Sequence, residues 1–274
     1  MRPIGFSTGP LPDGGVVALV DRFVKVAAGA VELSARRKKK LAPLVEILGH
    51  LDLSSFAHVS IHAPKQFKSP TEAEAARMLS ICIERGWPVV VHPDTIVDPA
   101  IWSAFGSLLT IENMDGRKDL GRTVEEMADV LARFPRASIC LDLAHASHID
   151  PHLRLARRLI EAFGPRLRQI HLSEIDAFGA HLPLRKSSPD YYRAVLRDLP
   201  ETVAVVLETP VPLECLAGQI DRARECFEPA SREVEERDFR RLVEARIRER
   251  VRARAISSET LVLPALPGNP GGEP

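Results

Sequence analysis

Residues 108–142 read LLTIENMDGRKDLGRTVEEMADVLARFPRASICLD, and this stretch decides the fold class. It begins and ends with short apolar runs, at 108–112 and 138–142, which have the length of buried strands. Between them, Thr123 followed three residues later by Glu126 is a helix-start signal, and an amphipathic run follows it. A strand, a helix and a second strand predict a βαβ unit with two parallel strands.

The same unit recurs along the whole chain. Short apolar runs occur at 3–6, 29–33, 58–62, 88–92, 108–112, 138–142, 167–172 and 203–208. Because stretches with helical spacing separate most of them, we expect a parallel sheet covered on its faces. Eight such strands predict an α/β fold closed into a (β/α)8 TIM barrel. An open doubly wound sheet is the alternative, but residues 5–10, Gly-Phe-Ser-Thr-Gly-Pro, do not form its Gly-rich phosphate turn.

The composition is that of a soluble globular enzyme. Hydrophobic residues make up 45% of the 274 residues, and 37 Lys and Arg balance 37 Asp and Glu, so the net charge does not favour nucleic acid as a partner. The four cysteines form no C-x-x-C pair, which predicts free thiols in a reducing cytoplasm. We find no secretion signal and no long apolar run, so we expect a cytoplasmic protein without membrane contact.

The C-terminal part differs in character from the rest. We divide the chain into a barrel at 1–228, a charged amphipathic helix at 229–255 and a flexible tail at 256–274. The helix carries a narrow apolar stripe with four-residue spacing, formed by Phe239, Val243, Ile247 and Val251. We expect it to pack on the barrel or on the partner subunit of a homodimer, with contact to nucleic acid as the alternative.

Most of the predicted strands end on or near an ionisable residue. These residues are Glu32, His62, His92, Glu112, Asp142, His171 and Glu208. Most of the intervals are close to the ~30 residues of one βα unit, so the residues recur at one level, the C-terminal rim where barrels build their active sites. Each residue alone has a structural explanation, as a hydrogen-bonded histidine or a helix cap. Together, converging carboxylates raise one another's pKa unless cations neutralise them, which predicts a metal site.

The kind of metal follows from the ligand atoms. Imidazole nitrogen combined with carboxylate oxygen suits Mn²⁺ or Zn²⁺, with Fe²⁺ or Co²⁺ as further candidates. Further polar residues follow the strands at 138–142 and 167–172, namely His145, Glu174 and His181. We expect these to stand slightly above the rim.

Six short segments in order carry a resemblance to a known family. They are Val31-Glu32-Leu33, Val91-His92-Pro93, Ile111-Glu112-Asn113, Asp142-Leu143-Ala144-His145, Ile170-His171-Leu172-Ser173 and Leu207-Glu208-Thr209. With these segments the chain resembles the xylose isomerase-like TIM-barrel superfamily, which includes sugar isomerases and epimerases and the endonuclease IV type of abasic-site nuclease.

The resemblance to the isomerases and epimerases implies a metal held by Glu112, Asp142, His171 and Glu208. It also implies catalytic roles for Glu112 and Glu208. One carboxylate removes the proton next to a carbonyl and the other returns it, through a metal-bound enediolate. The groups that bind the small-molecule substrate are then His145, His181, Glu32 and Glu174.

The resemblance to the nuclease branch implies additional metals. One is held by His62, His92 and bridging Glu112. Another requires His145, His181 and an aspartate two positions before the second histidine, where this chain has Gly179. The basic run 36–40 stands where that branch has a DNA-contacting loop, and it also suits an anionic substrate or a solvated helix start.

The favoured hypothesis is therefore a divalent-metal-dependent isomerase or epimerase acting on a sugar or related polyol. The second hypothesis is phosphodiester hydrolysis at abasic DNA, which Gly179 and the balanced charge weaken. Another multinuclear-metal reaction on the same barrel and a non-catalytic protein with a vestigial barrel stay open. The number of metals per chain separates these hypotheses: one argues against the nuclease, and two or three argue against the simple isomerase.

Overall fold

Eight parallel strands close into a barrel in the computed structural model, which describes residues 1–11, 15–36, 38–67, 70–229 and 236–260. Their order around the barrel is β1-β10-β7-β6-β5-β4-β3-β2, and β1 pairs with both β10 and β2. The strands are β1 (Ile4–Ser7), β2 (Ala30–Ser34), β3 (His58–His62), β4 (Val89–Val91), β5 (Leu109–Glu112), β6 (Ser138–Asp142), β7 (Leu167–Leu172) and β10 (Ala204–Leu207). This closure confirms the predicted barrel, and the open doubly wound sheet is wrong.

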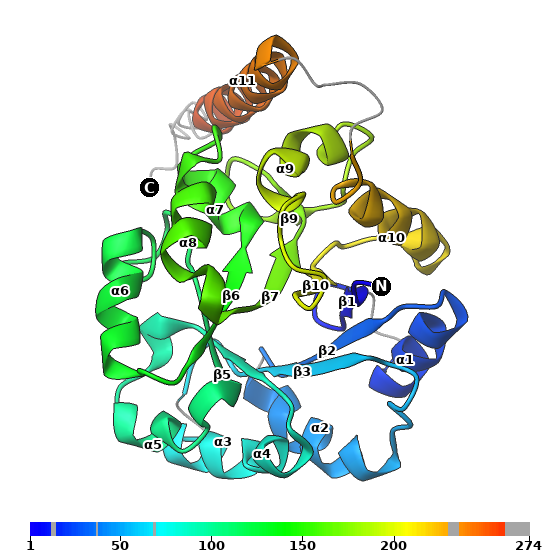
Figure 1. Ribbon diagram of the computed structural model, residues 1–274, viewed down its shortest axis with the longest axis vertical. Coiled ribbons are helices and arrows are strands. Elements are labelled where there is room, and N and C mark those ends of the chain that lie inside the picture. Colours follow the sequence, from blue (N-terminus) through cyan, green and yellow to red (C-terminus); the bar gives the residue numbers. More distant parts are fainter. Residues whose placement is uncertain (12–14, 37, 68–69, 230–235, 261–274) are drawn as a thin grey trace, which may run out of the picture.

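Helices surround the barrel (Figure 1). They are α1 (Val16–Lys25), α2 (Leu41–Ile47), α3 (Glu72–Leu79), α4 (Ile81–Arg85), α5 (Pro99–Ser103), α6 (Val124–Arg133), α7 (Leu143–Ile149), α8 (Arg154–Phe163), α9 (Ser188–Leu196), α10 (Leu216–Glu225) and α11 (Glu236–Thr260). Single 3-10 turns connect several elements: η1 (Lys38–Lys40), η2 (Leu48–His50), η3 (Pro93–Thr95), η4 (Gly106–Leu108), η5 (Gly164–Arg166) and η6 (Leu213–Cys215). A small antiparallel pair, β8 (Glu174–Ile175) and β9 (His181–Leu182), stands above β7.

The apolar pattern explains why these elements form. All residues of β5 and β6 are buried, as expected for strands covered by helices outside and by side chains inside. Helix α6 begins where predicted, because the Thr123 side chain accepts a hydrogen bond from the Glu126 N–H. Its apolar face, with Met127 and Val130, is buried against the barrel. The predicted strands agree with the observed ones to within one residue at either end.

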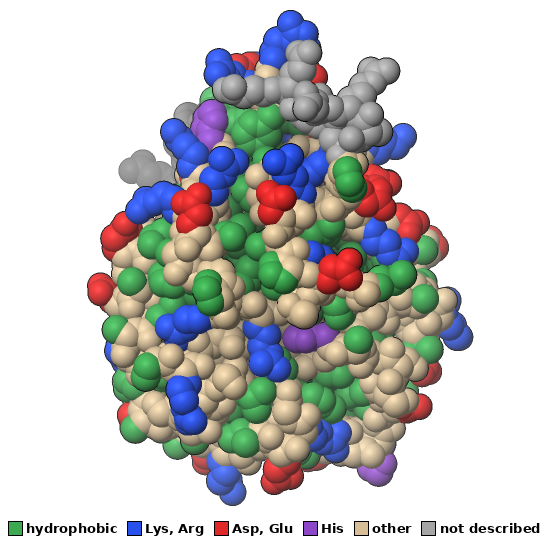
Figure 2. Space-filling model, viewed as in Figure 1, with side chains coloured by type: hydrophobic (Ala, Val, Ile, Leu, Met, Phe, Trp, Pro, Cys, Tyr) green, Lys and Arg blue, Asp and Glu red, His purple; other side chains and the backbone are tan. Residues whose placement is uncertain are grey.

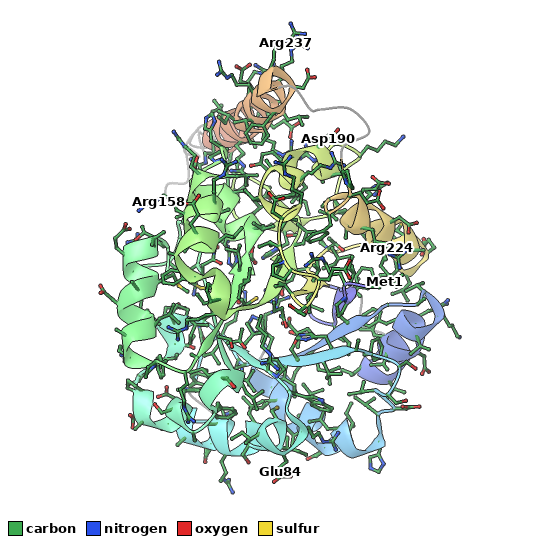
Figure 3. The ribbon with its side chains drawn as sticks, viewed as in Figure 1. Met1, Glu84, Arg158, Asp190, Arg224 and Arg237 are labelled. Atoms are coloured by element: carbon green, nitrogen blue, oxygen red, sulfur yellow. The ribbon has the colours of Figure 1, made fainter. Side chains whose placement is uncertain are left out.

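The surface is mixed in charge, in keeping with the balanced composition. Figure 2 shows acidic and basic side chains interspersed over one face of the molecule. Charged residues such as Glu84, Arg158 and Asp190 point outward from the helices (Figure 3). In the described part of the chain, no helix is both long enough and apolar enough to cross a membrane.

Helix α11 packs on the barrel's own helices, which is one of the two arrangements expected for it. Val243 is fully buried, and the Phe239 ring stacks on the Tyr191 ring of α9 with centroids 5.9 Å apart. The helix begins at Glu236 and continues to Thr260, so residues 256–260 are helical where we expected a tail. The rest of the expected tail, 261–274, and residues 230–235 of the predicted helix lie outside the described residues.

Candidate metal centre

Six of the seven predicted rim residues lie at or next to the C-terminal ends of the barrel strands. His62, Glu112 and Asp142 are the last residues of β3, β5 and β6, His171 is the last but one of β7, and Glu32 is the middle residue of β2. His92 directly follows β4, and Glu208 directly follows β10. Each of the seven is at most 2% exposed. Parallel strands in a closed barrel bring these ends together, so side chains far apart in sequence contact one another.

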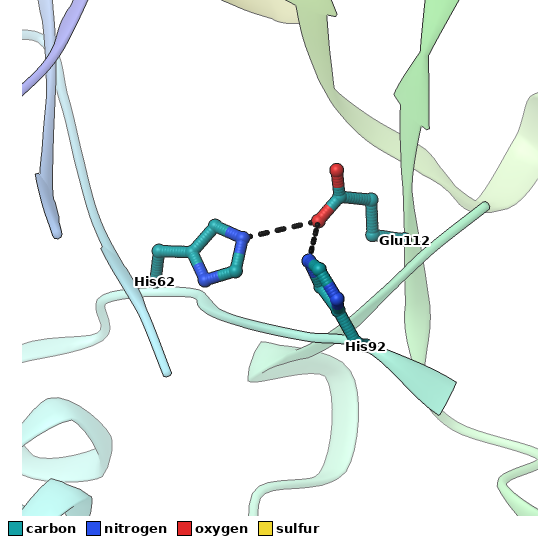
Figure 4. A group of neighbouring side chains, drawn as sticks. All are labelled: His62, His92 and Glu112. Carbon is teal, nitrogen blue, oxygen red and sulfur yellow. Dashed lines mark hydrogen bonds and ion pairs between the residues drawn. The ribbon is translucent and has the colours of Figure 1, made fainter. Parts of the chain in front are cut away.

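His62, His92 and Glu112 form the group drawn in Figure 4. Nε2 of His62 and Nε2 of His92 lie 3.1 and 3.0 Å from the same oxygen, Oε2 of Glu112. Nδ1 of His62 lies 2.8 Å from the carbonyl oxygen of Ala63 and donates to it, so Nε2 is the ring nitrogen that faces Glu112. A lone pair that faces a carboxylate oxygen requires a proton or a cation nearby. This group therefore has the arrangement of a cation site.

His171 lies between the carboxylates of the predicted inner set. Its Nδ1 is 3.2 Å from Oε1 of Glu112 and 3.8 Å from Oε1 of Glu208. The same nitrogen is 4.0 Å from Oδ2 of Asp142. The structure thus brings together the four residues that the resemblance implies as ligands of one metal.

Glu32 contacts the ring nitrogen of His171 that faces away from Glu112, and its carboxylate lies within 4.8 Å of the Glu208 carboxylate. Oε2 of Glu32 is 2.8 Å from Nε2 of His171 and accepts a hydrogen bond from the Gln169 side-chain amide at 2.8 Å. Gln169 in turn contacts the ring of His58, at the start of β3. These contacts fix the orientation of the His171 ring, with Nδ1 toward the inner carboxylates. Glu32 is therefore a partner of His171, and its contact with substrate stays a prediction.

Asp142, His145 and His181 form a further group, with candidate ligand atoms within 4.8 Å of one another. Nδ1 of His145 donates to the carbonyl oxygen of Asn113 at 2.9 Å, which leaves Nε2 as the metal-binding nitrogen of the neutral ring. Nε2 of His181 lies 3.5 Å from Oε2 of Glu208. Both histidines therefore stand against the inner set, where the sequence placed them.

Arg117 occupies the space beside Gly179, where the nuclease branch has an aspartate. A Cβ atom at Gly179 would lie 2.2 Å from Cζ of Arg117, and the φ angle of +82° also disfavours a side chain there. Arg117 donates to Oδ1 and Oδ2 of Asp115 at 2.9 and 2.6 Å. Oδ2 of Asp115 is 3.7 Å from Nε2 of His145. The carboxylate of Asp115, in the loop after β5, thus lies near this group. The sequence did not predict this residue.

Burial and mutual charge shift the pKa values of the cluster. Burial, together with the charges of Glu112 and Glu208, raises the pKa of Asp142 to about 7. Burial lowers the pKa of His92 to about 4, so this ring is neutral at physiological pH. Burial disfavours the charged forms of Glu112 and His171 as well, but neighbouring imidazoles stabilise the Glu112 carboxylate, and the carboxylates of Glu32, Glu208 and Glu112 stabilise the charged His171 ring. The pKa of Glu112 is therefore held well below its usual value, and the pKa of His171 is well above its own.

Several buried polar atoms of the cluster have no hydrogen-bond partner among the described residues. They are Oε1 of Glu32, both ring nitrogens of His92, Oδ2 of Asp142 and Oε1 of Glu208. An unsatisfied buried polar atom costs about 1–3 kcal/mol, and here such atoms gather in one place. They are imidazole nitrogens and carboxylate oxygens, which are the ligands of Mn²⁺ and Zn²⁺. The residues present therefore fit a divalent metal.

Arg36 also reaches the cluster, which the sequence analysis did not predict. Its Nη1 donates to Oε2 of Glu208 at 2.9 Å. Burial raises the pKa of Glu208, but Arg36 and His171 outweigh this effect and hold it well below its usual value. The signal in the sequence that could have indicated this contact was the position of Arg36, at the start of the basic run and two residues after β2 ends.

Glu174 lies outside the cluster, which corrects the expectation that it binds substrate. Arg246 of α11 donates to its Oε1 at 2.6 Å and to its Oε2 at 3.2 Å. The Ser188 hydroxyl donates to Oε1 at 2.6 Å. The guanidinium of Arg246 lies 3.9 Å above the centre of the Tyr191 ring. Both oxygens of Glu174 are therefore engaged in anchoring α11.

Comparisons with solved structures show the fold. The 3-keto-D-glucoside 4-epimerase YcjR from E. coli has a TM-score of 0.56 at 13% identity, over 82% of this chain and 100% of that one. A D-psicose 3-epimerase crystallised with D-fructose has a TM-score of 0.52 at 13% identity, over 93% and 99%. The protein SacUVDE has a TM-score of 0.51 at 12% identity, over 82% and 99%.

No curated protein matches the chain. The family model described as "Xylose isomerase-like TIM barrel" matches residues 97–244, which include the strand ends that carry Glu112, Asp142, His171 and Glu208.

Proposed function

The chain belongs to the xylose isomerase-like TIM-barrel family, and we propose that it is a divalent-metal-dependent isomerase or epimerase acting on a sugar or related polyol. The observation that carries this proposal is the convergence of Nδ1 of His171 with three buried carboxylates, those of Glu112, Asp142 and Glu208. The substrate class is supported by the family and by the two sugar epimerases among the similar structures.

The metal would be held by this inner set. The donor atoms suit Mn²⁺ or Zn²⁺, with Fe²⁺ or Co²⁺ as further candidates. When bound, a divalent cation supplies Lewis acidity toward the oxygens of the substrate. His145 and His181 stand beside the inner set and are proposed to bind substrate oxygens in this mechanism.

Glu208 is the carboxylate best placed to move a proton. Arg36 fixes its Oε2, whereas its Oε1 has no hydrogen-bond partner among the described residues. The low pKa keeps the group ionised at neutral pH. We assign the Glu208 carboxylate as the group that takes the proton from the carbon next to the substrate carbonyl and holds it as a carboxylic acid.

Glu112 is the partner carboxylate of the proposal. Its Oε2 faces His62 and His92, and its Oε1 faces His171, so three imidazoles position it. We propose that Glu112 serves in the second proton transfer and also holds the cluster together. Its removal is therefore expected to affect metal content as well as turnover.

Phosphodiester hydrolysis at abasic DNA is the second candidate function. The observation that favours it is the presence of two groups beyond the inner set, His62–His92–Glu112 and Asp142–His145–His181. Arg117, which fills the space at Gly179 and pairs with Asp115, counts against the third metal of that branch. The metal count decides between the two candidates.

Two assays on the metal-loaded protein test the proposal. Proton NMR in D₂O follows a panel of ketoses and aldoses, and a labelled duplex with one abasic site tests the nuclease. We expect at least one sugar to interconvert with exchange of the proton next to its carbonyl, and the duplex to stay intact. Cleavage of the duplex, with no exchange in any sugar, would overturn the proposal in favour of the second candidate.

A further inference from the structure

A cavity of about 580 Å³ adjoins the metal centre on the side of β1 and β2. Its walls include the turn after β1, the end of β2, α1 and α2. Four of its lining residues are basic: Arg36, Lys39, Lys40 and Lys65. None of the lining residues in the described part of the chain is acidic. A concave space with charges of one sign on its wall attracts ions of the opposite sign.

Arg36 belongs to both the cavity and the metal centre. It lines the cavity and donates through Nη1 to Glu208 at 2.9 Å. A guanidinium has five N–H donors, so Arg36 has donors beyond the one that Glu208 accepts. Its Nη2 lies against Gly9, where a Cβ atom would come within 2.4 Å of it. The guanidinium is thus held between the proposed proton-transfer group and the cavity.

Lys39, in η1, and Lys65, in the loop after β3, place positive charge on the wall of the cavity. Lys65 follows β3, and its backbone N–H donates to the Arg36 carbonyl at 3.1 Å, which holds the two loops together. Its ammonium is near enough to His92 to act on the charge of that ring. The hydroxyl groups of Thr8 and Ser34, both largely buried, add polar groups to the same cavity.

We propose that this cavity binds an anionic group, a phosphate or a carboxylate, carried by the polyol substrate, an inference that rests on the proposed function. In this arrangement Arg36 binds the anionic group in the cavity. The reacting carbons of the substrate then lie on the other side of Arg36, next to Glu208. The volume is that of a small-molecule pocket, which favours a sugar-sized anion over a DNA duplex. Specificity for anionic substrates then resides in residues outside the metal centre.

Isothermal titration calorimetry with the metal-loaded protein tests this site, using fructose 6-phosphate, gluconate, fructose and inorganic phosphate as probes. We expect one of the two anionic sugars to bind about tenfold or more tightly than fructose, and inorganic phosphate to compete with it. The relative affinities of fructose 6-phosphate and gluconate distinguish phosphate from carboxylate. In the double variant K39A/K65A we expect this preference to disappear, with unchanged metal content and melting temperature. Lys25→Ala, which removes an exposed lysine at the end of α1, is the matched control and should keep the preference.

Three results would overturn the inference. The first is equal affinity for fructose and both anionic sugars. The second is a preference for an anionic sugar that K39A/K65A leaves intact. The third is lysine-dependent binding of an abasic duplex that none of the small anions displaces, which would assign the cavity to nucleic acid. Phosphate binding is measured without turnover, so lysine-dependent phosphate binding in a protein that isomerises no sugar would refute the proposed function and leave the anion site standing.

Discussion

The two oxygens of the Glu208 carboxylate have different surroundings, and this difference assigns its role. Oε2 is fixed by Arg36 and Oε1 has no hydrogen-bond partner among the described residues. In Glu208→Gln the side chain keeps its size and loses the ability to accept a proton. We expect kcat to fall by about 10²–10⁴-fold while the variant still folds, as circular dichroism would show. Glu84→Gln, at an exposed position, is the control; normal kcat in Glu208→Gln would refute the assignment.

The raised pKa of Asp142 predicts how metal affinity depends on pH. In the absence of metal its pKa is about 7, because burial and neighbouring carboxylates disfavour ionisation, whereas metal binding requires the ionised form. Raising the pH through 7 removes the competing proton and therefore tightens binding; lowering it weakens binding. The raised pKa of His171 acts in the same direction. Competition with a chromophoric chelator at pH 6 and pH 8 should show tighter Mn²⁺ or Zn²⁺ binding at pH 8, and equal affinity would contradict this account.

His171, which the sequence located correctly, and Glu174, which it misplaced, differ in their position along the extended chain. His171 is the last but one residue of β7, where position along the chain fixes the level in the barrel. Glu174 comes three residues later, so in extended chain it points to the opposite face. It accordingly meets Arg246 of α11 and not the barrel axis. Strand alternation was the signal that could have excluded it. Arg36 and Asp115 lie in loops, where no period fixes a side chain's direction.

A buried ion pair between described residues adds to the apolar contacts that hold helix α11 to the barrel. The side chains of Arg246 and Glu174 are 5% and 3% exposed. Arg246→Ala leaves the carboxylate buried and unpaired, so we expect the free energy of unfolding to fall by about 3–5 kcal/mol. Chemical denaturation measures this loss. Arg248→Ala breaks only an exposed pair with Glu244 and should cost about 0–1 kcal/mol; equal effects of the two variants would show that the buried pair does not anchor the helix.

The bounds of α11 show what a sequence pattern leaves undetermined in an element. The apolar stripe predicted the helix and its packing, because Phe239 and Val243 recur on one face and are the residues that meet the barrel. Its end was predicted five residues early. No proline or glycine interrupts the chain between Glu236 and Thr260, so nothing stops the helix at Ala255.

At the scale of the whole molecule, the barrel was predictable because its strands are short, fully buried and regularly spaced. The rim cluster followed from closure, which brings Glu32 and Glu208 from opposite ends of the chain to one site. The number of metals could not be predicted from the sequence, because it depends on distances of a few ångströms between loops. Arg117 beside Gly179 illustrates this: the sequence shows a missing aspartate, and only the structure shows what fills its place.

The central claim is that the rim binds divalent metal through the inner set, and metal content measured together with stability tests it most directly. We expect inductively coupled plasma mass spectrometry to find at least one divalent metal per chain. We expect the free energy of unfolding to rise by about 2.7 kcal/mol when the free metal is 100 times its dissociation constant. His171→Ala should lose both effects, whereas His50→Ala, at an exposed position, should keep them. A wild-type protein that holds no metal and melts at the same temperature with and without Mn²⁺ or Zn²⁺ would contradict the account.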